Sequence, residues 1–260
     1  MAALLRRAQA ILPPLAIVAC AVAGWQLYAK LSGIGNDVLP APSRVLSVTW
    51  DNRGDLWTNT LATLRATLAG FALSLAVGMV LAVLVDSSAH IRRSIMPLLV
   101  VSQTLPIVAI APLMVLWFGF DLTPKVLIVA LVTFFPITVA LAEGFAASEP
   151  ETEALLRSMG ASRARVFRSV RFPTALPFFF AGLRIAITYA VVAAIFAEYA
   201  GASEGLGIYM ENAKNSFRID LVLAAVLVSA VLTLALFALT YLVERLAIPW
   251  YRLSRQGGRE

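Results

Sequence analysis

Cysteine and histidine are almost missing from this sequence, which contains only Cys20 and His90. One cysteine cannot form a disulfide within the chain or a cysteine-based metal site. One histidine cannot supply a histidine metal site or a catalytic triad, so we expect no catalytic and no metal-ligating residues. The phosphate-binding pattern Gly-x-x-x-x-Gly-Lys-Ser/Thr is also absent, so the chain has no loop of that kind to hold ATP.

Charge is scarce as well. Charged residues make up 14% of the 260 residues and hydrophobic residues 60%. An ordinary soluble domain has about 25% charged residues. A chain this apolar cannot hide its surface from water by folding alone, so we expect a lipid bilayer to be its solvent.

Long apolar runs dominate what is present. A helix needs about 20 apolar residues to cross the hydrocarbon core of a bilayer. Six stretches meet this length, and one of them contains Pro136. The expected fold is therefore all-α, a polytopic membrane protein with one transmembrane domain over residues 1–260. Its spans are expected at about 11–31, 64–85, 97–118, 125–143, 178–200 and 221–243.

Lysine and arginine are unevenly distributed between the connecting segments. With the N-terminus inside, the inner segments contain 13 of these residues and the outer segments contain 6. Basic residues favour the cytoplasmic side of a membrane, so we expect both termini in the cytoplasm. The net charge of +6 then follows membrane topology, and we expect no nucleic-acid partner.

The outer segments have their own patterns. The segment that begins "LPAPS" is expected to be an extended linker, followed at about 55–64 by a helix that lies along the membrane and leads into the second span. In the other outer segment, "GASEGLGIYMENAKNSFRID", the glycines predict a structured turn before a short interfacial helix.

A compact basic insert separates the fourth and fifth spans, at about 149–177. Glu153 lies in the first turn of a short helix, and Gly160 fits a left-handed C-terminal cap. Ser162 fits the N-cap of a second short helix, which Pro173 should end.

The insert can be interpreted in two ways. The simpler interpretation is a basic loop that only fixes the topology. The alternative is a docking knob, because Met159, Val166 and Phe167 would be exposed apolar residues beside arginines. The two-helix pattern with a glycine cap favours docking.

The run "MGASRARVFRSVRFPTALP" resembles the cytoplasmic signature of ABC importer permeases, which is Glu-Ala-Ala, three residues, Gly, nine residues and Ile-x-Leu-Pro. Gly160 matches the glycine, and the segment 170–173 matches the final motif. Glu153 stands one position early, so the opening triplet departs from the pattern. The segments "SQTLPIVAIAPLMVLWFGF", "FFPITVALAEGF" and "AEYAGASEGLG" also resemble permeases for sulfonate, taurine, nitrate and thiamine-precursor uptake, so the similarity covers nearly the whole chain.

The resemblance implies a type I importer fold, a place in the inner membrane of a bacterial cell, and a set of partners. The chain would pair with a second permease copy, usually as a homodimer, and would dock on an ABC ATPase dimer that binds ATP and Mg²⁺. A solute-binding protein would deliver the solute from outside, and this chain itself would hold no cofactor. The coupling residues would be Glu153, Met159, Gly160, Ala161, Ser162, Arg163, Arg165 and Pro173.

Polar residues inside the expected spans are candidates for the solute pathway. They are Ser102, Gln103, Thr104, Thr188, Tyr189 and Glu198. Polar groups within a span are costly unless protein or a water-filled path satisfies them. Hydrogen bonding between helices explains the group at 102–104 equally well, and packing is the simpler role for Thr188 and Tyr189. Arg184, near the inner end of the fifth span, is expected to extend toward the interface.

Two other functional classes remain as alternatives. An ion-coupled secondary transporter would need membrane acids, commonly with inverted repeats. The sequence has no evident repeat, and Glu198 is the one clear candidate acid within a span. A membrane enzyme would need a cluster of catalytic residues, which is absent. The substrate stays open between pyrimidine or riboflavin-like heterocycles and sulfonate, taurine or nitrate anions, although the third and fourth spans most resemble carriers of the heterocycles.

Overall fold

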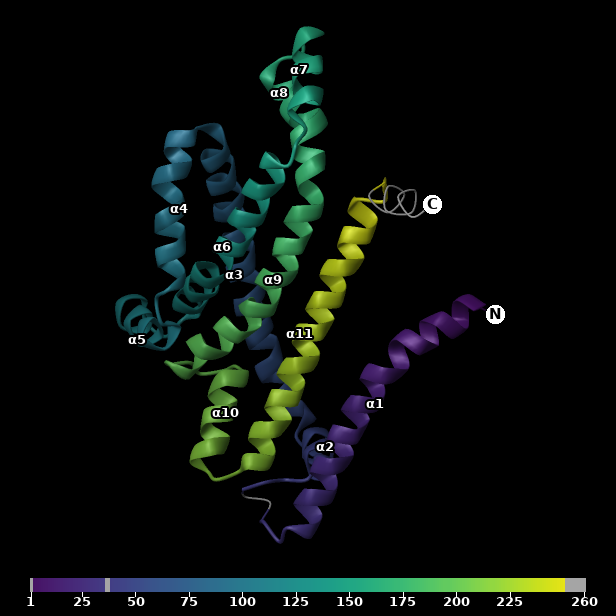
Figure 1. Ribbon diagram of the computed structural model, residues 1–260. Helices are drawn as coiled ribbons and strands as arrows, with labels where there is room; N and C mark the ends of the chain where they lie inside the picture. The colour runs from purple at the N-terminus through teal and green to yellow at the C-terminus, as the bar shows by residue number, and fades with distance from the viewer. Residues whose placement is uncertain (1, 36–37, 251–260) are drawn as a thin grey trace. The chain divides into compact units, whose positions relative to one another are not determined.

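The computed structural model describes residues 2–35 and 38–250, and these form helices and turns without any strand. The helices are α1 (Ala2–Leu31), α2 (Pro42–Asp51), α3 (Arg53–Ser87), α4 (Ala89–Gln103), α5 (Ile107–Phe118), α6 (Leu122–Ala146), α7 (Pro150–Ser158), α8 (Arg163–Val166), the π-helical turn η1 (Phe167–Arg171), α9 (Phe172–Tyr199), α10 (Leu206–Asn215) and α11 (Ile219–Ala247). Figure 1 shows their order along the chain. The predicted all-α polytopic fold is confirmed.

Five helical stretches in the described part are long and apolar enough to cross a membrane. They are Leu12–Leu31, Arg53–Ser87, Leu122–Ala146, Arg163–Tyr199 and Ile219–Ala247. A sixth span exists if α4 and α5, which meet at 94°, count together as one broken span. Six predicted spans therefore correspond to five single helices and one bent pair.

The predicted continuous span at 97–118 is wrong, because the helix breaks between Gln103 and Ile107. Pro106 precedes α5 with an extended backbone, at φ −72° and ψ 114°. A proline disfavours the helical conformation of the residue before it and cannot donate a hydrogen bond to the preceding turn. The apolar run continues through this point, but the backbone turns.

The described residues divide into two compact units, one from 2–35, 38–58 and 209–228 and the other from 59–208 and 229–250. In the first unit, α2 begins with Pro42 in its first turn and buries Val45 and Val48. Proline is favoured there because its fixed φ angle suits a helix start. The predicted extended linker is therefore partly a helix.

The predicted separate helix at about 55–64 is also wrong, since those residues form the beginning of α3. No proline interrupts the 35 residues of α3, so the helix continues without a break. The short helix expected after the second outer turn is confirmed as α10.

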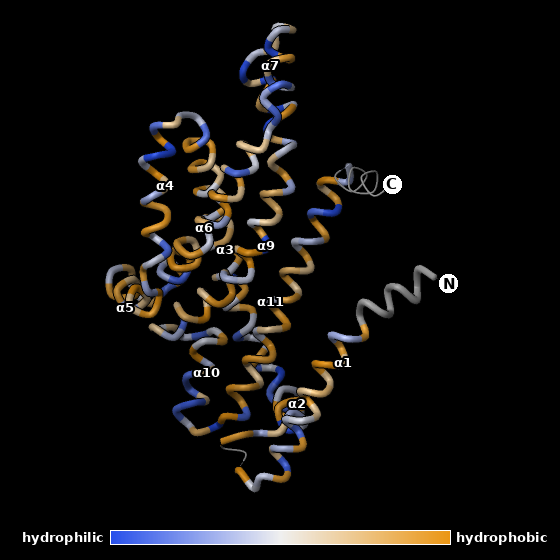
Figure 2. The backbone as a smooth tube through the Cα atoms, viewed as in Figure 1, coloured by the Kyte–Doolittle hydropathy of each residue, from blue (hydrophilic) through white to orange (hydrophobic). Residues whose placement is uncertain are grey.

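In the second unit, α6 and α9 pack along each other at close range. A Cβ atom added to Gly182 of α9 would lie 2.6 Å from the Cβ atom of Ala140 and 2.8 Å from the carbonyl oxygen of Pro136. Glycine allows such an approach because it has no side chain, and small residues are typical where membrane helices cross. Figure 2 shows the hydrophobic character of α6 and α9 and the hydrophilic character around α7.

The basic insert continues into α9 without a break. Pro173 does not end a helix, because α8, η1 and α9 form one helical stretch. The N–H of Phe172 donates to the carbonyl oxygen of Phe167, five residues earlier, and this π-helical turn lies just before the proline. Such turns accommodate proline within a membrane helix. The second arm of the insert is therefore an extension of the span itself.

Candidate functional site

The insert forms a hairpin, here called the basic hairpin (residues 150–171), beyond the end of α6 (Figure 1). Gly160 has a φ angle of 81°, as the sequence predicts for a helix cap. Its N–H donates to the carbonyl of Arg157, and the N–H of Ala161 donates to the carbonyl of Leu156. These two bonds form a Schellman motif, which ends α7 sharply. The predicted N-cap is confirmed too, since the Ser162 hydroxyl accepts from the N–H of Arg165.

A network of charged side chains joins the basic hairpin to the spans. Arg171 donates to the carboxylate of Asp86 at 2.7 Å and to the carbonyl of Phe145 at 3.2 Å. Its Nε atom also lies 3.2 Å from the Glu153 carboxylate, which accepts from the Ser148 hydroxyl at 2.6 Å. Charge-assisted contacts of this kind are stronger than neutral ones. Arg171 thus links α3, α6 and α7 at one point.

The tip of the basic hairpin presents apolar side chains to its surroundings. Leu155 is 61% exposed and Met159 75% exposed. Arg163 and Arg165 are exposed beside them, and neither forms an ion pair with any described residue. The tip therefore combines an apolar centre with free positive charge.

Two residues expected at the tip lie elsewhere. Val166 is buried, and Phe167 packs with its ring centroid 5.2 Å from that of Phe145. Phe167 faces α6 because η1 continues the face of α9 that packs on this helix. The prediction that they are exposed is wrong, and the exposed apolar part of the tip is smaller than expected.

A groove of about 650 Å³ lies along α6 and α9, next to the break between α4 and α5, and is here called the α6–α9 groove. Its size is typical of small-molecule sites. Of the predicted pathway residues, Gln103 and Tyr189 line it. Glu143 of α6 lines it as well, although the sequence analysis treated this residue only as the end of a span. An acid within an apolar run was the signal that could have identified it.

The other predicted pathway hydroxyls bond within their own helices. Ser102 donates to the carbonyl of Leu99 and Thr104 to that of Val101. Thr188 donates to the carbonyl of Arg184 at 2.9 Å. These contacts satisfy the hydroxyls locally, without the bonds between helices that the sequence analysis considered.

Glu198 does not face an open path, because its side chain is 1% exposed. Its carboxylate accepts from the Thr63 hydroxyl at 3.1 Å and from the N–H of Gly207 at 2.8 Å. The N–H of Leu206 donates to the Thr63 hydroxyl oxygen, and the N–H of Gly205 to the Asn59 side chain. Glu198, a candidate for the solute pathway, is therefore closed off from water in this structure. It fixes the turn between α9 and α10 against α3.

Arg184 forms an ion pair with Glu244, near the end of α11. The expectation that it extends toward the interface stays a prediction. A charge within a span is costly, and pairing with an opposite charge reduces this cost. The sequence could not identify this pair, because the two residues are 60 positions apart.

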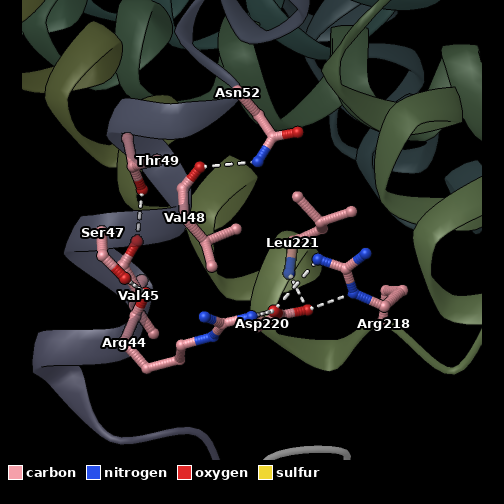
Figure 3. A network of polar contacts seen from close by, with 9 residues as sticks. All are labelled: Arg44, Val45, Ser47, Val48, Thr49, Asn52, Arg218, Asp220 and Leu221. Carbon is pink, nitrogen blue, oxygen red and sulfur yellow. Dashed lines mark hydrogen bonds and ion pairs between the residues drawn. The ribbon is translucent and has the colours of Figure 1, made fainter.

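In the first unit, Asp220 at the start of α11 joins two arginines (Figure 3). It accepts from Arg218 at 2.9 Å and from Arg44 of α2 at 3.2 Å. The Asp220 carboxylate raises the pKa of Arg218 above its ordinary value, chiefly through this hydrogen bond. Asp220 also accepts from the N–H of Leu221, so it caps the start of α11 and holds α2 beside it.

No group of three or more histidine, cysteine, aspartate or glutamate side chains suited to a metal ion occurs among the residues that the structure describes.

Comparison with known families decides the class of protein. Residues 74–249, more than half of the chain, match the family described as binding-protein-dependent transport system inner membrane component. This chain belongs to that family. It is an ABC importer permease component and a multi-pass inner-membrane protein.

Relatives of this permease have various named solutes. The formylaminopyrimidine transport permease protein ThiX of Halalkalibacterium halodurans is 36% identical over 227 residues, covering 87% of this chain and 90% of that protein. The riboflavin transport system permease protein RibX of Chloroflexus aurantiacus is 36% identical over 231 residues, covering 87% and 85%. The taurine transport system permease protein TauC of Escherichia coli is 29% identical over 234 residues, covering 87% and 85%.

Solved structures show the same fold. A chain of the MetNI methionine ABC transporter in inward-facing conformations has a TM-score of 0.62 at 16% identity, covering 76% of this permease and 97% of that chain. A chain of an amino acid ABC transporter crystallised with histidines also has a TM-score of 0.62, at 20% identity, covering 77% and 97%. The permease therefore has the fold of type I ABC importers.

Proposed function

We propose that this permease couples ATP hydrolysis on a partner subunit to import of a small organic solute across the inner membrane of a bacterial cell. The basic hairpin is the observation that carries the proposal. Its tip contains Met159, Gly160, Ala161, Ser162, Arg163 and Arg165, while Glu153 and Pro173 lie where it joins the spans. Because its second arm is continuous with α9, a displacement of the tip would move the span.

The ATPase subunits would bind the hairpin tip. Leu155 and Met159 offer an apolar centre for a pocket on the partner, while the unpaired Arg163 and Arg165 suit acidic residues around its rim. ATP and Mg²⁺ would bind on that partner. With the ATPase on the cytoplasmic side, the hairpin and both termini would lie in the cytoplasm. The basic tail beyond residue 250 lies outside the described residues.

A second permease copy and a solute-binding protein would complete the importer. One copy offers a groove that is open along one side, and a homodimer would close a pathway from two of them. The binding protein would deliver the solute at the outer end, where α10 and the start of α11 lie in this orientation. The family's dependence on binding proteins supports this arrangement.

For the solute, we favour a nitrogen heterocycle related to pyrimidines or flavins. The ThiX and RibX permeases are each 36% identical to this chain, whereas the taurine permease is 29% identical. The identities support the heterocycle over a taurine-type sulfonate.

The family match disfavours an ion-coupled secondary transporter, because this family is described by its dependence on binding proteins. Asp86, Asp220 and Glu244 pair with arginines, and Glu198 is bonded to Thr63 and Gly207. These four acids near helix ends are thus committed to structural contacts.

Uptake energetics test the proposed function. In cells containing the permease with its ATPase and binding protein, we expect accumulation of radiolabelled solute to stop when the ATPase is inactivated by substitution. Accumulation should continue when an ionophore collapses the proton gradient while ATP is maintained. Uptake that follows the gradient without a working ATPase would contradict the proposal.

A further inference from the structure

The charge lining the α6–α9 groove comes from one side chain. Among the described residues that line it, Gln103, Glu143 and Tyr189 have polar side chains, and Glu143 alone is charged. Glu143 is exposed and forms no hydrogen bond or ion pair through its carboxylate with any described residue. It differs in this respect from Asp86, Glu153 and Glu244, which are paired with arginines.

The helix geometry places Glu143 along the groove wall. Val132, Pro136, Val139 and Glu143 line the groove at intervals of three or four residues, so they form one face of α6. On α9, the lining residues from Phe178 to Tyr189 recur at the same intervals. Glu143 therefore lies at the end of a continuous surface formed by two helices.

An unpaired carboxylate is costly against lipid or against an apolar face of a second copy. Water or a ligand must therefore reach Glu143. The helix ends at the other end of the groove supply little net charge, because the C-terminus of α4 and the N-terminus of α5 meet there with opposite partial charges. The carboxylate is the dominant charge that a solute would meet.

We propose that Glu143 is a specificity-determining residue that faces the solute in the α6–α9 groove. This inference rests on the proposed function. The carboxylate accepts hydrogen bonds from amino and ring N–H groups, while Phe135, Phe178 and Tyr189 offer aromatic surfaces for a flat ring. The solute class is therefore an amino-substituted nitrogen heterocycle, neutral or cationic, and the same carboxylate repels sulfonate and other anions.

Paired thiol reagents of opposite charge test this electrostatic claim directly. A Val139→Cys variant in a Cys20→Ala background places a thiol in the groove, one helical turn from Glu143. Its rates of reaction with a trimethylammonium and a sulfonate methanethiosulfonate are measured in the full permease–ATPase complex, in the presence and absence of nucleotide. The ratio of the two rates cancels any effect of Glu143 on the reactivity of the thiol itself.

We expect Glu143→Gln to lower the ratio of cationic to anionic reaction rates at least about fivefold. A unit charge about 7 Å away in water attracts one reagent and repels the other, and the two effects multiply in the ratio. The matched control is Asp121→Asn, which removes an exposed carboxylate at the opposite end of α6. This control should leave the ratio unchanged. An equal effect of both variants, or no effect of Glu143→Gln, would overturn the inference.

Protection of the same thiol tests the solute class. We expect 4-amino-2-methylpyrimidine to slow the cationic reagent at Val139→Cys and ethanesulfonate at equal concentration to have no effect. Glu143→Gln should abolish the protection. Protection by the sulfonate, or protection by the pyrimidine that persists without the carboxylate, would overturn the proposed specificity.

The failures of this inference and of the proposed function are distinguishable. A thiol that reacts with neither reagent in any nucleotide state would show that a second copy or other protein fills the groove, and would overturn its role as a pathway. ATP-dependent uptake could still be intact in that case. Loss of the ATP requirement for uptake would instead contradict the proposed function.

Discussion

Glu198 has a buried carboxylate, and two glycines allow the chain to pack closely against it. A Cβ atom added to Gly205 would lie 2.2 Å from the carboxyl carbon of Glu198, and one added to Gly207 would lie 2.3 Å from the carbonyl oxygen of Ile195. The atom near Gly207 belongs to the backbone, and the one near Gly205 ends a side chain that is held by Thr63 and the N–H of Gly207. The two glycines therefore allow the turn to close over the carboxylate, so that the N–H of Gly207 and the Thr63 hydroxyl can replace water around it.

Substitution of Gly205 tests this close approach. Gly205→Ala adds a clash and a strained backbone, since the φ angle is 139°. We expect a loss of about 1–3 kcal/mol in the free energy of unfolding. Gly54→Ala is the control, because an added Cβ atom there meets no atom within 4 Å. Thermal unfolding of both purified variants measures the difference, and equal stability would contradict the close packing described for Glu198.

At the scale of elements, local chemistry explains what the sequence could predict. The Gly160 cap and the Ser162 N-cap depend on residues within a few positions, and both are present in the structure. The contact between Asp86 and Arg171 joins residues 85 positions apart, so no local pattern indicates it. The exposure of Glu143 likewise depends on how α6 and α9 cross.

The sequence contains a local signal for the break between α4 and α5, but a prediction from hydropathy does not use it. Leu105 precedes Pro106, and Gln103 interrupts the apolar run just before them. The high average hydropathy of the run nevertheless predicts a single span, because an average does not register backbone direction. The fold class was therefore predictable, whereas the shape of this span was not.

The crossing of α6 and α9 yields a second prediction at this scale. Gly182→Ala should lower the thermal unfolding temperature, since the added methyl group would meet both Ala140 and the backbone of Pro136. Ala140→Gly in the same chain should restore part of the loss by removing one of these clashes. Full stability of the single variant, or no rescue in the double variant, would contradict the close crossing.

At the scale of the whole molecule, the topology can be tested with single cysteines in a Cys20→Ala background. A cysteine at Ser162 should react with a membrane-impermeant reagent only from the cytoplasm, and one at Ser203 only from outside. Both serines are exposed in the described structure. Labelling of Ser162→Cys in intact cells would show that the hairpin lies outside, and would contradict the orientation on which ATPase docking depends.

The hairpin's role as the mechanical link is the central claim. Gly160→Val places a β-branched residue at a φ angle of 81°, which such residues strongly resist, so the tip should lose its shape. The space around Gly160 is open, with no atom within 4 Å of an added Cβ, so the spans should still fold.

The decisive measurement is solute-stimulated ATP hydrolysis by the purified permease–ATPase complex in lipid vesicles with its loaded binding protein. We predict that Gly160→Val abolishes both the stimulation and the uptake, while the amount of permease in the membrane stays unchanged. Wild-type stimulation and uptake by this variant would contradict the account.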